Sequence, residues 1–168
     1  MEIREAVIGD EEGIARVHVD SWRTTYKGIV SDGYLDQLSV EQRTENWRRG
    51  IGNNSLYVAV EDGEIVGFAT GGKERTGNYS ADCELFAIYL LQKVQGKGIG
   101  KQLMQVVAMD LKKQGSTKML VWVLDLNPAK KFYEAVGGQR VGETMIEIGG
   151  ESFKEIAFVW DLEKFVNK

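Results

Sequence analysis

The amino-acid sequence predicts an α/β (α+β) fold in which helices cover both faces of one central sheet. Two observations predict it. Helix-like patterns dominate residues 10–52, and strand-like runs then alternate with helices as hairpin, strand, helix, strand, helix and a last pair of strands. Elements in this order bury their apolar sides in layers around a sheet. The chain has 168 residues, 43% of them apolar, which suits a single domain, residues 1–168, with a sizeable core.

Composition narrows the classes of function. The net charge is −4 and neither sign gathers in a tail, so we expect no nucleic-acid partner. One cysteine, Cys83, and one histidine, His18, exclude an internal disulfide and a cysteine-based metal cluster, so we expect no metal site. No apolar run approaches the roughly 18 residues that span a bilayer, and the N-terminus has no apolar signal core. We therefore expect a cytoplasmic protein with no membrane partner.

The first part of the chain carries the helical patterns. Residues 1–7 alternate like a strand. Asp10 can cap a helix that has acids in its first turn, where the helix dipole favours them. One face of this helix carries Ile14, Val17, His18 and Ser21. Ser39 and Gln42 form a capping box that opens a second helix, which ends near Gly50.

The period of the pattern changes after this helix. Residues 56–60 and 65–70 are strand-like, and Asp-Gly at 62–63 between them is a strong hairpin signal. A polar loop at 73–80 leads to a long apolar strand at 83–91. This part of the chain is expected to begin the sheet.

The last part of the chain adds a helix, a strand, a short helix and a hairpin. The glycine-rich residues 95–100 open a helix that runs to Gln114. Residues 119–124 read as a buried strand, and Asn127 caps a short helix with Pro128 at its first position. The final hairpin has its strands at 140–148 and 152–160.

The glycine-rich turn has the chemistry of a phosphate site. Glycines allow close approach of the backbone to an anion, and the free N–H groups of a helix start favour a phosphate. Lys97 and Lys101 add positive charge. A Walker loop and the dinucleotide fingerprint both fail, because Gln102 and Lys101 stand where Ser/Thr and a third glycine are required. A tight turn with incidental glycines is the alternative.

Two motifs, in order along the chain, resemble the GNAT superfamily of acyl-CoA-dependent N-acetyltransferases. Gln95-x-x-Gly98-x-Gly100 is similar to the pyrophosphate loop of that family. Residues 127–134 (NPAKKFYE) and the glycines that follow resemble its second box, with the asparagine one residue nearer the tyrosine than in many members and Gly138 in place of the usual aromatic residue. The resemblance covers residues 56–161. Residues 21–28 are also similar to bacterial small-molecule, polyamine-type members.

The resemblance implies a mixed, mostly antiparallel sheet of six or seven strands, splayed near its centre. The splay is expected between the strand that ends near Leu90 and residues 119–124, where it would admit the pantetheine arm of acetyl-CoA, the implied co-substrate. In this family the loop follows a bulged strand, and a bulge at residues 88–90 would leave their backbone groups unpaired for this arm. The implied cofactor contacts are the backbone of Ile88, Tyr89 and Leu90, the loop residues Gln95, Gly96, Lys97, Gly98, Ile99, Gly100 and Lys101, and Asn127.

Acetyl transfer requires a neutral amine, whose reference pKa of about 10.4 calls for a base near pH 7. Glu84 is the candidate base, because it lies eleven residues before Gln95, the offset of the catalytic glutamate in histone-acetylating members. Tyr133 is the candidate acid for the departing thiolate. The alternatives are a solvated strand-edge carboxylate for Glu84, a packing role for Tyr133, and a plain N-cap role for Asn127.

Trp22 and Tyr26 lie in the segment that walls the acceptor site in this family, although core packing is an alternative for both. The predicted function is transfer of acetyl from acetyl-CoA to a primary amine by direct attack. The partner is then a small-molecule amine or a protein amino group, and a homodimer is left open. The alternatives are a non-catalytic acyl-CoA-binding sensor or scaffold, and an unrelated phosphate-binding module, which leaves the second motif unexplained.

Overall fold

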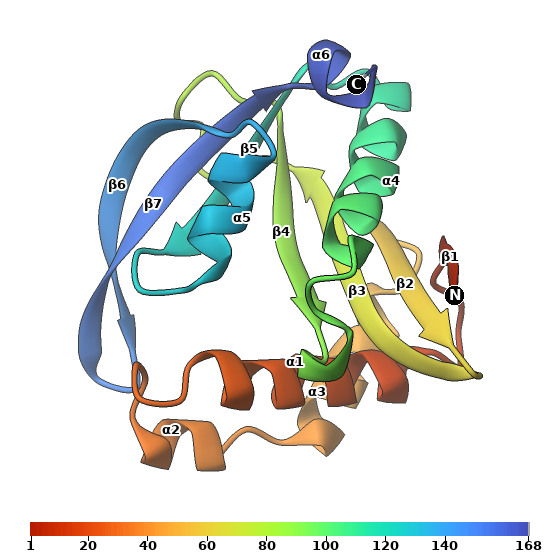
Figure 1. Ribbon diagram of the computed structural model, residues 1–168, viewed down its shortest axis with the longest axis vertical. Coiled ribbons are helices and arrows are strands. Elements are labelled where there is room, and N and C mark those ends of the chain that lie inside the picture. Colours follow the sequence, from red (N-terminus) through yellow and green to blue (C-terminus); the bar gives the residue numbers. More distant parts are fainter. Residues whose placement is uncertain (168) are drawn as a thin grey trace.

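The structure is a computed structural model that describes residues 1–167. Within that range the chain forms a sheet of seven strands in the order β1-β2-β3-β4-β5-β7-β6 (Figure 1). The strands are β1 Glu2–Glu5, β2 Ser55–Glu61, β3 Glu64–Lys73, β4 Cys83–Leu90, β5 Lys118–Leu124, β6 Gln139–Ile148 and β7 Glu151–Asp161. The helices are α1 Glu11–Thr25, α2 Asp32–Asp36, α3 Val40–Gly50, α4 Ile99–Lys113, α5 Ala129–Ala135 and α6 Leu162–Val166, with a 3₁₀ helix at Gln92–Val94. This mixed, mostly antiparallel sheet confirms the predicted fold class.

Local signals in the sequence set the boundaries of the N-terminal helices. Ser39 caps α3 as predicted, since its hydroxyl accepts the N–H of Gln42 at 3.2 Å. Asp10 stands at the start of α1, but its carboxylate turns to β1 and accepts from the N–H of Val7 at 2.8 Å and from Arg4. The boundary at Asp10 is therefore correct, although its side chain joins α1 to the first strand instead of capping the helix.

The β2–β3 hairpin forms where Asp-Gly predicts it. Asp62 and Gly63 both have positive φ, 53° and 77°, as the favoured two-residue hairpin turn requires. The short helices α2, α6 and Gln92–Val94 were absent from the prediction, because helices of three to five residues contain too few turns to show a period.

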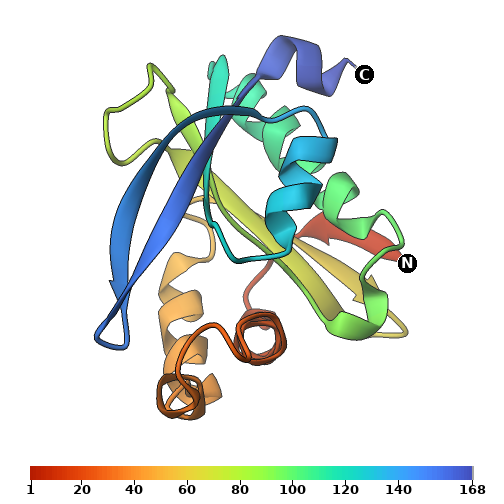
Figure 2. The ribbon, with the colours of Figure 1, turned by 60° about the vertical axis from the view of Figure 1, so that its left-hand side comes forward.

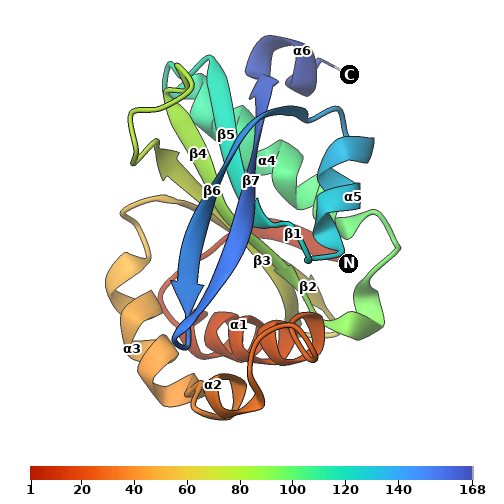
Figure 3. The same cartoon turned by 90° about the vertical axis from the view of Figure 1, so that its left-hand side faces the viewer.

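Helices cover both faces of the sheet, as predicted (Figure 2). On β3, Phe68 packs with Ile14 and Val17 of α1, whereas the next residue, Ala69, packs with Leu103 of α4. Successive side chains of a strand point to opposite faces, so these contacts define two layers. The long β6–β7 hairpin curves away from the other strands toward α1 and α2 (Figure 3). Its residues Ile146, Ile148 and Phe153 pack against Tyr26, Val30 and Leu35.

β4 and β5 are joined at one end only. Cys83 pairs with Met119 and Glu84 with Leu120, and within the described chain no further pair follows. β5 is instead paired with β7 along its whole length. The two central strands therefore separate after Glu84, which confirms the predicted splay.

The joined end is held by the carboxylate of Asp82, which lies just before β4. It accepts the backbone N–H of Thr117 at 2.9 Å and that of Lys118 at 3.0 Å. The backbone N–H of Asp82 also donates to the carbonyl of Lys118. These bonds fix where the two strands meet and therefore where they part.

The bulge in β4 lies earlier than predicted. Phe86 is skipped between the pairs that Leu85 and Ala87 make with β3, whereas residues 88–90 remain in register with that strand. The strand before the glycine-rich loop is therefore bulged, but at Phe86 and not within the segment 88–90. The edge of residues 88–90 that faces away from β3 is open for a different reason, namely that β5 has moved away from it.

Candidate active site

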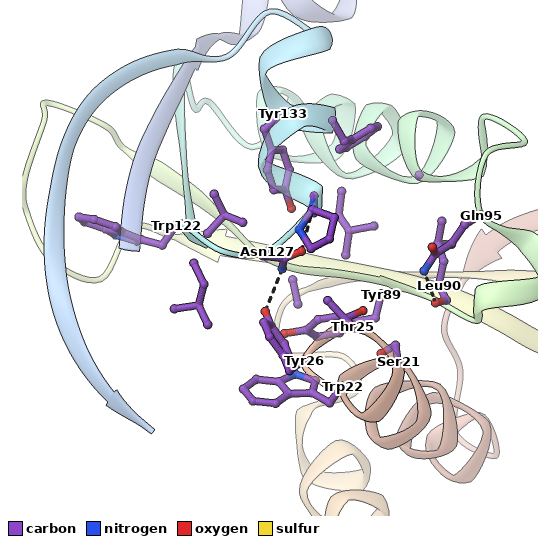
Figure 4. A pocket seen from close by; sticks show the side chains of 18 of the residues that line it. Ser21, Trp22, Thr25, Tyr26, Tyr89, Leu90, Gln95, Trp122, Asn127 and Tyr133 are labelled. Carbon is purple, nitrogen blue, oxygen red and sulfur yellow. Dashed lines mark hydrogen bonds between the residues drawn. The ribbon is translucent and has the colours of Figure 1, made fainter. Parts of the chain in front are cut away.

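A cavity of about 610 Å³ lies in the opening between β4 and β5 (Figure 4). It brings together segments that are far apart in the sequence: α1, β4, the glycine-rich loop, β5, the start of α5 and the β6–β7 hairpin. The lining includes these predicted site residues: Trp22, Tyr26, Glu84, Ile88, Tyr89, Leu90, Gln95, Gly96, Gly98, Ile99, Gly100, Lys101, Asn127 and Tyr133. Lys97 is exposed and does not line the cavity.

The glycine-rich loop presents free backbone N–H groups. Gly96 and Gly98 have φ of 78° and 82°, which other residues rarely adopt, and Gly98 is the N-cap of α4. The first hydrogen bond back along the helix runs from Gln102 to the carbonyl of Gly98 at 3.2 Å. The N–H groups of residues 99–101 have no backbone partner among residues 1–167. Such a helix start, with Lys101 beside it, suits a phosphate.

Gln95 connects this loop to the end of β4. Its side-chain amide donates to the carbonyl of Leu90 at 3.4 Å (Figure 4). Besides its predicted contact with the cofactor, Gln95 therefore has a structural role, because this bond holds the loop next to the open strand edge.

Tyr133 is held by aromatic side chains. It is buried, and its ring lies 5.3 Å from that of Phe132, 5.9 Å from Trp160 and 6.4 Å from Phe158. The hydroxyl end points into the cavity toward Asn127 (Figure 4). Burial raises the pKa of the Tyr133 phenol above its usual range, so the group keeps its proton at neutral pH. The ring therefore packs, as the alternative supposed, while the hydroxyl is presented to the cavity.

Asn127 and Tyr26 form a bridge across the opening. The amide nitrogen of Asn127 donates to the Tyr26 hydroxyl at 2.9 Å, joining residues 101 positions apart (Figure 4). The amide oxygen accepts the N–H of Ala129, the first residue of α5, at 2.8 Å. Pro128, and not Asn127, is the N-cap residue of α5, so the helix begins one residue later than predicted, although the Asn127 side chain still satisfies its first N–H. Because the Tyr26 oxygen accepts, its own proton is free to be donated into the cavity.

An aromatic wall surrounds this bridge on the α1 side. The rings of Trp22 and Tyr26 lie 4.5 Å apart, and His18 stacks on Tyr89 at 5.2 Å with 15° between the planes. The indole N–H of Trp47 donates to Nδ1 of His18 at 3.3 Å. Burial, with a smaller effect of nearby Arg43, lowers the pKa of His18 to about 4. His18 is therefore a neutral side chain that packs against Tyr89 from the helix face on which the sequence places it.

Glu84 faces the same side of the sheet as this wall. Its neighbours Cys83 and Leu85 are packed in the core with α4, so Glu84 points the other way. Its side chain is only 1% exposed, and Oε2 binds Nη2 of Arg75 at 2.7 Å. Oε1 accepts from the backbone N–H and Nε of Arg75. The alternative of a solvated strand-edge carboxylate is therefore wrong, because Glu84 is buried and ion-paired.

Two charged residues of this wall were not predicted. Arg75 comes from the polar loop, with its guanidinium 4.6 Å above the ring of Phe86, and nothing in the sequence distinguishes it. Glu155 on β7 also lines the cavity. A signal for Glu155 did exist: it is a carboxylate within the otherwise apolar alternation Phe153, Glu155, Ala157 and Val159.

A splayed sheet with a glycine-rich helix start on one side and a buried carboxylate on the other is the arrangement expected of an acyl-CoA-dependent acetyltransferase. The chain belongs to the acetyltransferase (GNAT) family, whose model matches residues 16–138, more than half of the chain. The protein is accordingly an N-acetyltransferase by family. The predicted family and the predicted enzyme class are both confirmed.

Relatives agree with this assignment. The chain is 39% identical over 158 residues to the uncharacterized N-acetyltransferase YuaI of Bacillus subtilis, covering 94% of this chain and 91% of that protein. It is 26% identical over 151 residues to the spermidine N(1)-acetyltransferase of Thermoplasma acidophilum, with 86% and 91% covered.

Solved structures share the fold. The PaiA N-acetyltransferase of Thermoplasma acidophilum, in complex with coenzyme A, matches with a TM-score of 0.73 at 24% identity, over 95% of this chain and 98% of that one. YncA of Salmonella typhimurium, solved with acetyl-CoA, matches with a TM-score of 0.72 at 18% identity, over 96% and 93%. The predicted co-substrate, acetyl-CoA, agrees with the molecules bound in these two structures.

Two properties of residues 1–167 bear on the remaining expectations. Their helices all fall short of the length and apolar character needed to cross a membrane. Within the same range, His, Cys, Asp and Glu side chains form no group of three or more that could hold a metal ion.

His18 makes stability depend on pH. Its pKa is about 4 in the folded chain and about 6.5 when unfolded, so between these values the unfolded chain binds the proton more tightly. The free energy of unfolding should therefore fall as the pH drops from about 6.5 to about 4, by at most about 3 kcal/mol from this group. His18→Asn, which keeps an acceptor for Trp47, should flatten that part of the curve in urea unfolding. Equal slopes for both proteins would contradict the assignment.

Proposed function

We propose that the protein transfers the acetyl group of acetyl-CoA to a primary amine by direct attack. The observation that carries this proposal is the single cavity through the splay, because the glycine-rich loop and Tyr133 line it on one side of the sheet and Glu84 on the other. When bound, acetyl-CoA supplies the activated acetyl thioester.

The residues present fit this co-substrate. The unpaired N–H groups of residues 99–101 and the Lys101 side chain suit the pyrophosphate, and the glycines before them carry no side chain to block its approach. Along residues 88–90, alternate residues direct their backbone groups to opposite sides, and Leu91 donates to Val66 of β3. Tyr89 therefore pairs with β3, and the open edge offers the backbone groups of Ile88 and of Leu90 to the pantetheine arm, the Leu90 carbonyl also accepting from Gln95. Asn127 has one amide hydrogen left after its bond to Tyr26, so it can also donate to that arm.

Glu84 is proposed as the group that receives the proton of the amine. Both of its oxygens are engaged by Arg75, and the side chain is almost fully buried, so the proton reaches it through a water molecule. Carboxylate oxygens have about four lone-pair sites in total, which leaves room for such a water beside the guanidinium. Arg75 fixes the orientation of the carboxylate by binding both of its oxygens.

Tyr133 is proposed to stabilise the sulfur that leaves. As the nitrogen–carbon bond forms and the carbon–sulfur bond breaks, charge develops on sulfur and the phenol donates a hydrogen bond to it. A thiol has a reference pKa of about 8.5, whereas burial holds the phenol pKa above its usual range. Full proton transfer from Tyr133 is therefore uphill, and its contribution is a hydrogen bond of moderate size.

A panel of amines tests the proposal directly. The protein is mixed with acetyl-CoA and one amine at a time, and release of free thiol is followed. The panel includes monoamines, diamines, amino acids and peptides with free N-termini. If acetyl-CoA binds tightly and no amine releases thiol, a non-catalytic acyl-CoA sensor is the better interpretation.

Gly98→Val should weaken the binding of acetyl-CoA at least about tenfold, because a side chain at this N-cap obstructs the approach of the pyrophosphate. Calorimetry measures the change. Gly77→Val is the matched control: it also introduces valine at a positive φ with no atom within 4 Å of the new Cβ, but it lies in the loop after β3, outside the cavity lining. Unchanged binding by a folded Gly98→Val variant would place the pyrophosphate elsewhere.

Tyr133→Phe should lower kcat by about a hundredfold, the lower end for loss of one hydrogen-bond donor to a developing charge, and leave the affinity for acetyl-CoA nearly unchanged. The phenol points toward Asn127 and lies away from Gln95 of the glycine-rich loop (Figure 4). Tyr57→Phe, on β2 and outside the cavity lining, is the control. Full kcat in Tyr133→Phe would remove Tyr133 from the mechanism.

Glu84→Gln should lower the rate most at low pH, where the amine is most fully protonated and its deprotonation is hardest. As the pH rises, the growing fraction of neutral amine should partly restore the rate. The comparison is a pH–rate profile against the wild type, with Glu151→Gln at the exposed end of β7 as control. A profile that is lower by the same factor at every pH would contradict the role of base.

A further inference from the structure

Glu155 lines the cavity on the same side as Glu84 and, among residues 1–167, has no side-chain partner. It is in the middle of β7 and pairs with Leu124, the last residue of β5, at the open end of the splay. Directly paired residues point to the same face, and Leu124 packs with Tyr26, the residue that follows α1. Glu155 therefore points to the α1 side, the same side as Glu84, and both line the cavity.

The position is costly for a carboxylate. Glu155 is half-buried within an otherwise apolar row of side chains, so part of its hydration is lost. Among residues 1–167 it makes no ion pair and no side-chain hydrogen bond, in contrast to Glu84. Lys154, the adjacent residue, lies on the opposite face and is 3.8 Å from Glu143.

The charges of this wall do not balance. Arg75 compensates Glu84, which leaves the negative charge of Glu155. Burial and the nearby charge of Glu84 raise the pKa of Glu155, and Arg75 offsets this only in part. A positive group beside Glu155 would offset both the lost hydration and the repulsion by Glu84, whereas a substrate carboxylate would add a third negative charge.

We propose that Glu155 binds a second positive charge of the acceptor, so that the preferred acceptors are diamines and longer polyamines. This rests on the proposed function, because one amine group of the same molecule must react near Glu84. The surroundings suit the rest of such a molecule. Trp122, Ile146 and Ile148 line the cavity beside the hairpin, where methylene groups can pack and an ammonium can lie against an aromatic face.

Comparison of putrescine with butylamine isolates the contribution of the second positive charge, since the two amines share a four-carbon chain and differ by one ammonium group. The wild type should acetylate putrescine with a kcat/KM at least about tenfold above that for butylamine. Glu155→Gln should remove most of that preference by raising the KM for putrescine, and should change butylamine by less than about twofold. Glu147→Gln is the control, because Glu147 is exposed on β6 between two lining residues and does not line the cavity.

Inhibition gives a second measurement that does not depend on acetylation of the test compound. Tetramethylputrescine has two positive charges and no primary amine, so it should inhibit the wild type more strongly than dimethylbutylamine, and Glu155→Gln should abolish the difference. Equal use of putrescine and butylamine by the wild type would overturn the proposal and leave the acetyltransferase function intact. A Glu155→Gln variant that lowers kcat equally for both amines would also overturn it, since Glu155 would then act on the proton. If neither amine nor any other releases thiol, the proposed function fails and this proposal fails with it.

Discussion

β4 and β5 are parallel neighbours that pair only at their first residues, and the rest of the site depends on this short pairing. Asp82 fixes the start of both strands through the backbone of Thr117 and Lys118, and two residue pairs follow before the strands separate. Backbone groups along the opened edge need hydrogen-bond partners that the protein no longer supplies. An extended ligand arm can supply them in the manner of an added strand. The opening is therefore a site that a linear co-substrate can complete, and the same gap connects the two faces of the sheet.

Each face of the sheet contributes a different kind of chemistry to this gap. The α4 and α5 side carries the helix start and Tyr133, which suit phosphate and sulfur. The α1 side carries carboxylates and aromatic rings, which suit an amine. The hydrogen bond between Asn127 and Tyr26 crosses between them and holds the short helix α5 to α1. Because α5 is only seven residues long, this bond and the aromatic packing of Tyr133 give the phenol a defined position that the helix alone would not provide.

Sequence reasoning reached the elements and motifs because those signals are local. The Asp-Gly turn, the cap at Ser39 and the loop at 95–100 each depend on a few consecutive residues, and the order of strands and helices then limits the fold. The partners of the site residues, in contrast, are set by contacts between segments that are far apart in the sequence. Arg75 reaches Glu84 from a loop with no regular pattern, and Glu155 comes close only through the pairing of β7 with β5. The position of the bulge was also wrong, since a bulge depends on register with β3, which the sequence of β4 alone does not determine.

Gly138 illustrates how a departure from a motif can be compensated elsewhere. The second family motif usually has an aromatic residue at this position. Here a Cβ on Gly138 would come within 2.6 Å of the ring of Trp160 and 2.8 Å of the Tyr133 carbonyl oxygen, so no larger side chain fits without movement. Trp160 is an aromatic residue supplied by β7; its ring lies 5.9 Å from that of Tyr133, and its N–H donates to the carbonyl of Val136 at 3.2 Å. Packing density in a core is conserved more strictly than the source of the atoms. The missing aromatic residue therefore does not weaken the case for Tyr133, because its ring is still enclosed.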